Sequence, residues 1–198
     1  METLVHEIAA VAARMVVDDG LDYGAAKRRA AKQVGAPPRA ALPGNDVLET
    51  AVREYIALFH ADTQPGELAA LRQLALTWME RLAEFRPHVA GAVWNGTATR
   101  LSDIYLQLFC DDPKSAEIAL IDRQVAYNVQ TVTGFNGASV DALTLSSGCP
   151  ELGEQVGVHL LIHDYDELRG ALKPSGDGAA PRGDRPALLR RMAEEAVA

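Results

Sequence analysis

Residues 91–106 read Gly-Ala-Val-Trp-Asn-Gly-Thr-Ala-Thr-Arg-Leu-Ser-Asp-Ile-Tyr-Leu, and this stretch decides how the rest of the chain is interpreted. Its two glycines, Gly91 and Gly96, permit tight turns and backbone conformations with positive φ. After Asp103 the apolar residues fall on every second position, at Ile104, Leu106, Leu108 and Cys110. That period is typical of a strand with one buried face. The stretch therefore predicts a glycine-containing loop that leads directly into a strand.

The first 87 residues have the apolar periodicity of helices. One helix face carries Leu4, Ile8, Val11 and Met15, and a second, Ala-rich helix extends from a cap at Asp22 to Lys32. A linker with three prolines follows at 36–44. Two further helices carry apolar stripes at Leu48, Val52, Tyr55 and Phe59 and at Leu71, Trp78, Leu82 and Phe85. We expect both stripes to pack against the sheet, because an amphipathic helix needs a partner surface.

Downstream of the quoted stretch the sequence predicts further strands. Residues 115–122 fit a short helix or the return strand of a hairpin equally well. Strands are expected at 125–133, at 139–145 after the hairpin dipeptide Asn136-Gly137, and at 156–163. A helix is expected at 164–172, and a Gly/Pro-rich tail from Pro174 precedes a short helix at 186–196. His159 lies in the apolar run and is interpreted as a core histidine.

The element order indicates an α+β fold, with a mixed or antiparallel sheet flanked by helices. We expect an N-terminal helical region at 1–87, an α/β core at 88–173, and a flexible tail with a short helix at 174–198.

Composition and charge limit the classes of partner. The formal net charge is −8, from 27 acidic and 19 basic residues, and this negative charge disfavours general binding to a nucleic-acid backbone. The basic run at Lys27–Arg29 is interpreted as a solvated helix face. The start of the chain lacks the pattern of a signal peptide, and no apolar run is long enough to cross a membrane. Two cysteines, Cys110 and Cys149, are expected as buried thiols, which is typical of a cytoplasmic protein.

The stretch 91–106 resembles the strand–loop–strand motif of the nucleotidyltransferase superfamily, which includes polymerase beta and the small, minimal nucleotidyltransferases. Gly91 matches the first glycine of the motif, Gly96-Thr97-Ala98 match its loop, and Ser102-Asp103-Ile104 match the start of its second strand. The resemblance implies a nucleotidyltransferase-like sheet. It also implies that Gly91, Gly96, Thr97 and Ser102 bind a nucleotide, with the loop amides forming a cradle for phosphate.

In that family a pair of aspartates at i and i+2 and a third carboxylate on a neighbouring strand hold two metal ions. By this analogy Asp103 and Asp141 are the expected catalytic and metal-binding residues, with Mg²⁺ as cofactor and a nucleoside triphosphate as ligand or substrate. The strand of Asp141 also places Leu143 and Leu145 on the same face, so a position at the edge of the core is equally open.

Two positions depart from the motif. Ala92 replaces the serine that would contact phosphate, and Tyr105 replaces the second aspartate. A phenol is a poor ligand for Mg²⁺, which prefers carboxylate and water oxygens. We therefore expect a degenerate member with an impaired metal site, which binds a nucleotide or a protein partner.

Two other functions stay open at this point. One is an active Mg²⁺-dependent transfer of a nucleoside monophosphate from a triphosphate to a small-molecule or protein acceptor. The other is a non-catalytic α+β interaction module in which the motif is a coincidence.

Overall fold

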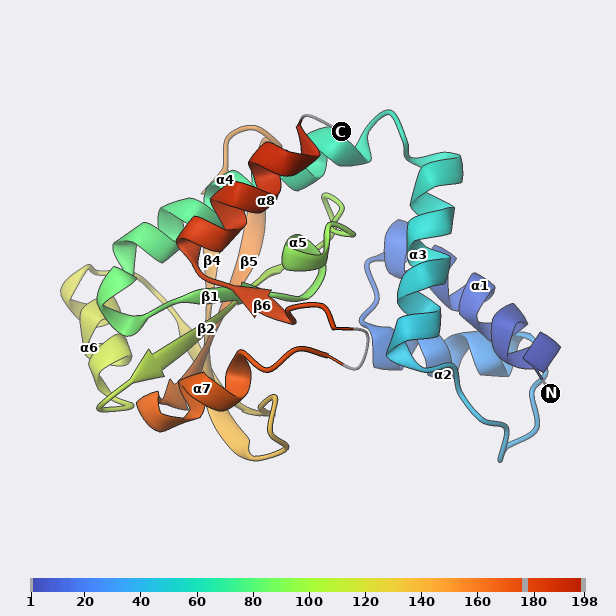
Figure 1. Ribbon diagram of the computed structural model, residues 1–198, viewed down its shortest axis with the longest axis horizontal. Helices are drawn as coiled ribbons and strands as arrows, with labels where there is room; N and C mark the ends of the chain where they lie inside the picture. The colour runs from blue at the N-terminus through green and yellow to red at the C-terminus, as the bar shows by residue number, and fades with distance from the viewer. Residues whose placement is uncertain (1, 176–177, 197–198) are drawn as a thin grey trace. The chain divides into compact units, whose positions relative to one another are not determined.

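The computed structural model describes residues 2–175 and 178–196 and has the expected α+β fold, with an N-terminal helical region (Figure 1). The helical elements are α1 (Glu2–Asp19), α2 (Tyr23–Gln33), α3 (Asn45–Phe59), α4 (Gln64–Arg81), η1 (Ala83–Phe85), α5 (Gly91–Asn95), α6 (Ser115–Asp122), η2 (Tyr165–Glu167), α7 (Leu168–Ala171) and α8 (Arg185–Glu195). The strands are β1 (His88–Ala90), β2 (Ile104–Cys110), β3 (Asn128–Thr133), β4 (Ser139–Cys149), β5 (Glu154–Asp164) and β6 (Arg182–Gly183). Of the expected flexible tail, residues 176–177 and 197–198 lie outside the described residues.

The chain divides into two compact units. The first contains the residues up to Gly66 together with Thr99–Leu101, and the second contains Glu67–Ala98 and the residues from Ser102 onward. By this division most of α4 belongs to the second unit. The three-part division expected from the sequence stays a prediction.

The first unit has a hydrophobic core of its own. Ile8 and Met15 of α1 pack with Leu48 and Val52 of α3, and Ala26 of α2 joins the same cluster. The expected packing of the Leu48/Val52 stripe against the sheet is therefore wrong, because α1 and α2 supply the apolar surface that this stripe needs. Its last residue, Phe59, is mostly exposed, and Ile56 is buried in its place.

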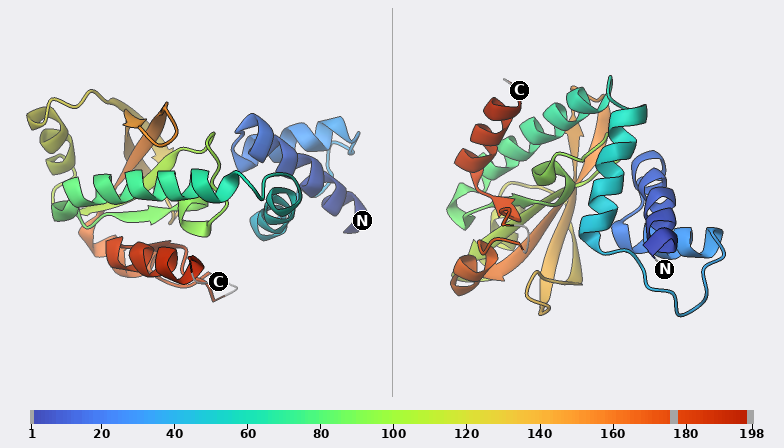
Figure 2. Two further views of the ribbon diagram at one scale, coloured as in Figure 1. Left: turned by 90° about the horizontal axis from the view of Figure 1, so that it is seen from above. Right: turned by 45° about the vertical axis from the view of Figure 1, so that its right-hand side comes forward.

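The second unit is built on a mixed sheet (Figure 2). Its strands have the order β3-β4-β5-β2-β1-β6. β2 and β5 are parallel neighbours at its centre, and the other pairs are antiparallel. The hairpin between β3 and β4 turns at Gly137, whose φ of 81° requires glycine or a residue that tolerates positive φ. Residues 115–122 form a helix, which decides the question that the sequence left open.

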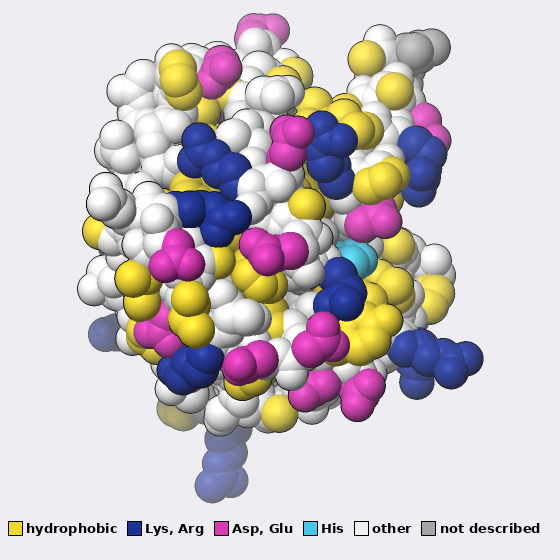
Figure 3. All heavy atoms as spheres, turned by 90° about the vertical axis from the view of Figure 1, so that its left-hand side faces the viewer, with side chains coloured by type: hydrophobic (Ala, Val, Ile, Leu, Met, Phe, Trp, Pro, Cys, Tyr) yellow, Lys and Arg dark blue, Asp and Glu magenta, His cyan; other side chains and the backbone are white. Residues whose placement is uncertain are grey.

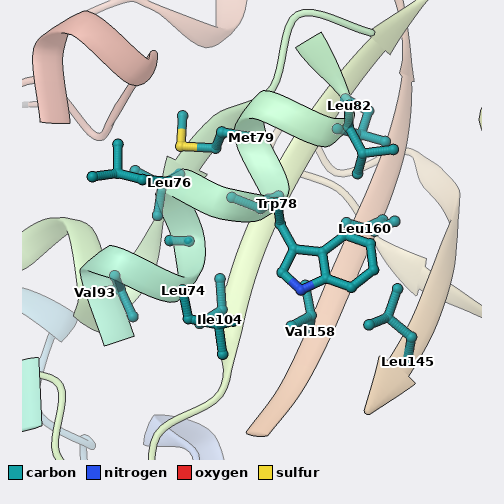
Figure 4. Packing of buried hydrophobic residues seen from close by; sticks show 14 of the residues in the cluster. Leu74, Leu76, Trp78, Met79, Leu82, Val93, Ile104, Leu145, Val158 and Leu160 are labelled. Atoms are coloured by element: carbon teal, nitrogen blue, oxygen red, sulfur yellow. The ribbon is translucent and has the colours of Figure 1, made fainter. Parts of the chain in front are cut away.

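One face of the sheet forms the main hydrophobic core and is covered by α4 (Figure 4). Trp78 of α4 lies against Val158 and Leu160 of β5 and Leu145 of β4. Its indole Nε1 donates a hydrogen bond of 3.0 Å to Oγ of Ser147. The expected packing of the Leu71/Trp78/Leu82/Phe85 stripe against the sheet is confirmed.

The opposite face, which we call the second face, carries polar and aromatic side chains. Strand alternation places Tyr105 and Gln107 of β2 on it, together with His159 and His163 of β5. One row crosses five strands in register, from β6 to β4: Arg182, Ala90, Tyr105, His159 and Thr144.

Among the described residues, the helices are all too short or too polar to span a lipid bilayer.

Candidate functional site

The glycine-containing loop begins where β1 meets α5. Gly91 is the first residue of α5 and has φ of 67°, and Gly96 ends that helix with φ of 87°. L-residues rarely adopt either conformation, so glycine is needed at both positions. The two glycines that carry the resemblance are therefore explained by backbone geometry, and this explanation holds whether or not a ligand binds there.

The amides of this loop are already used within the loop. The N–H groups of Gly96, Thr97 and Ala98 all donate to the carbonyl oxygen of Ala92, at 2.9, 3.0 and 3.2 Å. The carbonyl oxygen of Ala92 thus accepts the hydrogen bonds of the three N–H groups that would otherwise bind a phosphate. These three amides are therefore engaged within the loop in this conformation, and the phosphate cradle and the nucleotide-binding roles of Gly91, Gly96, Thr97 and Ser102 stay predictions. Thr97 is buried, and its Oγ1 has no hydrogen-bond partner.

Two arginines hold α5 in place. Arg72 of α4 is buried; its Nε donates to the carbonyl of Val93 at 3.0 Å, and its guanidinium pairs with Glu195 of α8. Arg191 of α8 donates to the carbonyl of Trp94 at 2.7 Å and lies 3.8 Å from the centre of its ring. Because α4 and α8 hold the carbonyl end of α5, the loop after it starts from a fixed position.

Asp103 lies immediately before β2 and is hydrogen-bonded to two groups of β5. Its Oδ2 is 2.8 Å from Nε2 of His159, and its Oδ1 accepts a hydrogen bond of 3.2 Å from the amide of Gly157. The hydrogen bond to His159 lowers the pKa of the Asp103 carboxyl, against the opposing effect of burial. Asp103 is therefore ionised at neutral pH, and β5 already supplies its hydrogen-bond donors.

His159 connects Asp103 to two further residues. Its Nδ1 is 2.9 Å from Oγ1 of Thr144 on β4. In the neutral imidazole, a hydrogen on Nε2 serves Asp103 and leaves Nδ1 to accept from the threonine hydroxyl. The ring of Tyr105 stacks on the imidazole, with centroids 4.6 Å apart and an interplanar angle of 17°. We call Asp103, Tyr105, Thr144 and His159 the Asp103 cluster.

The structure does not bring Asp141 to this cluster. Strand alternation places Asp141 on the face of Leu143 and Leu145, opposite to the face of Thr144. Asp103 precedes Ile104, so it is level with Gly157 and Ser146. Asp141 is five positions further along β4, which corresponds to about 16 Å. The family analogy would bring Asp103 and Asp141 together at one metal site, and the strand register keeps them apart.

Asp141 instead lies on the side of the sheet that faces α6. The pKa of Lys114, just before α6, is raised by its hydrogen bond to Glu117 and, to a smaller extent, by the charge of Asp141. The alternation with Leu143 and Leu145 was the correct signal, and the family analogy pointed to the wrong carboxylate.

The residues around Asp103 do not fit the metal ions that the resemblance implies. Tyr105 follows Asp103 by two positions, where the motif needs a second carboxylate. His159 of β5 contacts both Asp103 and Tyr105, at the place where a third carboxylate would be needed. No group of three or more His, Cys, Asp or Glu side chains that could hold a metal occurs within residues 2–175 and 178–196. Mg²⁺ prefers several oxygen ligands, and here one carboxylate is engaged by an imidazole and an amide.

Sequence reasoning missed the roles of His159 and Thr144. His159 is not a core histidine, since its side chain is 20% exposed and lies on the second face. The available signal was the alternation of Val156, Val158, Leu160 and Ile162, which leaves His159 on the other side of β5. Thr144 gave no signal, because its contact with His159 depends on the register between β4 and β5.

Surface charge agrees with the composition. Acidic and basic side chains are interspersed over the face of the molecule that Figure 3 shows, with hydrophobic side chains between them. This face therefore does not offer the continuous basic surface that a nucleic-acid backbone requires.

No protein-family model matches this chain, and no curated protein or solved structure is significantly similar to it. The resemblance to nucleotidyltransferases therefore rests on the residues of the motif.

Proposed function

We propose that this chain is a nucleotidyltransferase-like protein that binds a nucleotide on the second face and does not carry out metal-dependent transfer. The observation that carries the proposal is the pairing of Asp103 with His159. The first motif aspartate is retained, but an imidazole and a phenol stand where further carboxylates would be needed. Without them, Asp103 lacks the partners that hold two divalent ions.

Binding of a nucleotide is supported by the character of the Asp103 cluster. Tyr105 is 43% exposed, and stacking on the imidazole of His159 restricts the movement of its ring. A partly exposed aromatic ring of this kind offers a surface on which a nucleobase can stack. The neighbouring carboxylate of Asp103 is 45% exposed and accepts hydrogen bonds from amino or hydroxyl groups.

A nucleotide panel in a thermal-shift assay tests the proposal. A nucleotide that binds the folded state raises Tm, and we expect the same shift with EDTA, Mg²⁺ or Mn²⁺. Tyr105→Leu should reduce the shift in Tm, because it removes the stacking surface. Tyr127→Leu is the control: it removes a tyrosine that is hydrogen-bonded to Glu117 and should leave the shift unchanged.

Two results would contradict the proposal. A shift that appears only with a divalent ion would support the Mg²⁺-dependent enzyme. The absence of any nucleotide-dependent shift would instead support a protein-binding module.

A further inference from the structure

A group of buried polar atoms without hydrogen-bond partners lies on the second face, apart from the Asp103 cluster. Among the described residues these atoms include Nε and Nη1 of Arg182, Nε2 of His163 and Oε1 of Gln107. All three residues are at least nine-tenths buried. A buried polar atom without a partner costs free energy, so a group of them indicates that something else satisfies them.

Ring contacts through Phe135 join Arg182 to His163, and Gln107 lies on the same face of the sheet. The guanidinium of Arg182 lies 4.6 Å from the centre of the Phe135 ring, and that ring lies 4.8 Å from the ring of His163. Gln107 is paired with His88 across β2 and β1, on the face that Arg182 shares. Burial is the main cause that lowers the pKa of both His163 and His88, and the positive charge of Arg182 lowers both further.

Arg182 has no carboxylate partner in the described structure. Burial lowers the pKa of its guanidinium, and no acidic group among residues 2–175 and 178–196 offsets that effect. A guanidinium nonetheless keeps its charge at neutral pH, because its ordinary pKa is far higher. A buried cation without a charged partner is matched by an oxyanion, which can accept a charge-assisted hydrogen bond from Nε or Nη1.

His163 and Gln107 restrict the kind of oxyanion. Oε2 of Glu167 lies 3.0 Å from Nδ1 of His163, and a carboxylate accepts, so the hydrogen lies on Nδ1. Burial lowers the pKa of His163, which keeps the imidazole neutral and leaves Nε2 as an acceptor. Oε1 of Gln107 is a second acceptor. The site thus has two unused donors and two unused acceptors.

We propose that Arg182, His163 and Gln107 form a binding site for a phosphate group that carries a proton. The charged oxygens accept from Arg182, and the P–OH group donates to His163 or Gln107. A sulfate or a carboxylate has no hydrogen to donate at neutral pH and leaves both acceptors unsatisfied. The site does not depend on the proposed function, because inorganic phosphate is its simplest ligand.

Phe135 stands at the entrance to this site. It lies in the turn between β3 and β4, is partly exposed, and contacts both Arg182 and His163.

Titration calorimetry of the full chain with sodium phosphate and with sodium sulfate at equal ionic strength tests the site. We expect phosphate to bind and sulfate to bind at least about tenfold more weakly, since one unmade hydrogen bond costs about that much. Arg182→Gln should abolish phosphate binding. Arg190→Gln changes the net charge equally at an exposed position of α8 and should leave binding unchanged.

A second measurement covers the case in which Arg182→Gln does not fold. Histidine side-chain nitrogen resonances of the wild-type protein should show Nε2 of His163 perturbed by phosphate and not by sulfate. Binding of a nucleoside monophosphate is then compared with binding of the same nucleoside and of inorganic phosphate. The comparison shows whether the site prefers free phosphate or a phosphate monoester. Equal binding of sulfate, or no binding of phosphate with His163 unperturbed, would overturn the proposal.

Discussion

Oδ2 of Asp103 lies 2.8 Å from Nε2 of His159. The carboxylate just before β2 is therefore hydrogen-bonded to an imidazole of the parallel strand β5. The chain therefore has the backbone structure of the motif without its group of metal-binding carboxylates. The glycine positions and the strand of the motif are present, while the retained aspartate serves as a partner for a histidine. The consequences can be measured on stability, on metal binding and on catalysis.

The Asp103–His159 pair makes stability depend on pH in the acidic range. The pKa of Asp103 is lowered below its ordinary value of 3.8 in the folded state, chiefly by the hydrogen bond to His159. Its contribution to the free energy of unfolding is therefore present above pH 3.8 and is lost as the pH falls through the folded-state pKa. Asp103→Asn should lower the urea midpoint at neutral pH and have little effect well below pH 3.8. Asp141→Asn, an exposed carboxylate of the other face, is the matched control. An equal loss at both pH values would contradict this assignment.

Gly157 leaves the space that the Asp103 carboxylate occupies. A Cβ added at this position would lie 2.6 Å from Oδ1 of Asp103 and 2.7 Å from its Cγ, so the carboxylate must move. Gly157→Ala should therefore lower the free energy of unfolding by about 1.5–3 kcal/mol, the scale of one disrupted hydrogen bond to a charged group. Gly170→Ala adds its methyl group where no other atom lies within 4 Å and serves as the control. Equal unfolding midpoints for the two variants would show that Asp103 is not held as described.

Trp78 fixes α4 to the sheet. It is almost completely buried and contacts β4 and β5 (Figure 4). Trp78→Ala should lower the free energy of unfolding by roughly 3–5 kcal/mol, because a large cavity remains. Trp78→Phe keeps most of the apolar contact and loses the bond to Ser147, so its cost should be clearly smaller. A near-neutral effect of Trp78→Ala in denaturant unfolding would contradict the described packing.

The parts of the fold that depend on local pattern were predictable. The stripe of α4, the alternation of β2 and the turn at Gly137 follow from the sequence periods and from glycine geometry. The partners of each strand were not predictable, because the placement of β5 beside β2 joins residues more than fifty positions apart. The two-residue strand β6 gave no periodic signal, so Arg182 was missed.

The candidate site was predictable only in part. Asp103 was found through the motif, but its partners His159 and Thr144 depend on strand register, which one sequence does not specify. Asp141 was misplaced because family analogy was followed against the alternation with its own neighbours, Leu143 and Leu145.

Restoring carboxylates around Asp103 should create affinity for a divalent ion. Tyr105→Asp combined with His159→Asp places three carboxylates on one face, and Ala92→Ser restores the motif serine. The triple variant should bind Mn²⁺ in a titration followed by Tm or by paramagnetic broadening, whereas the wild-type protein should not. Tyr105→Asn with His159→Asn is the uncharged control. Equal Mn²⁺ binding by the wild-type protein would show that the existing cluster is already a metal site.

The most direct measurement is a transfer assay of the wild-type protein with nucleoside triphosphates labelled on the α-phosphate and either Mg²⁺ or Mn²⁺. Pyrophosphate release and labelling of the protein or of added acceptors are followed together. Asp103 is paired with His159, and the described residues place no second carboxylate beside it, so we predict no release above that of Asp103→Asn. Metal-dependent release by the wild-type protein that Asp103→Asn abolishes would contradict the account.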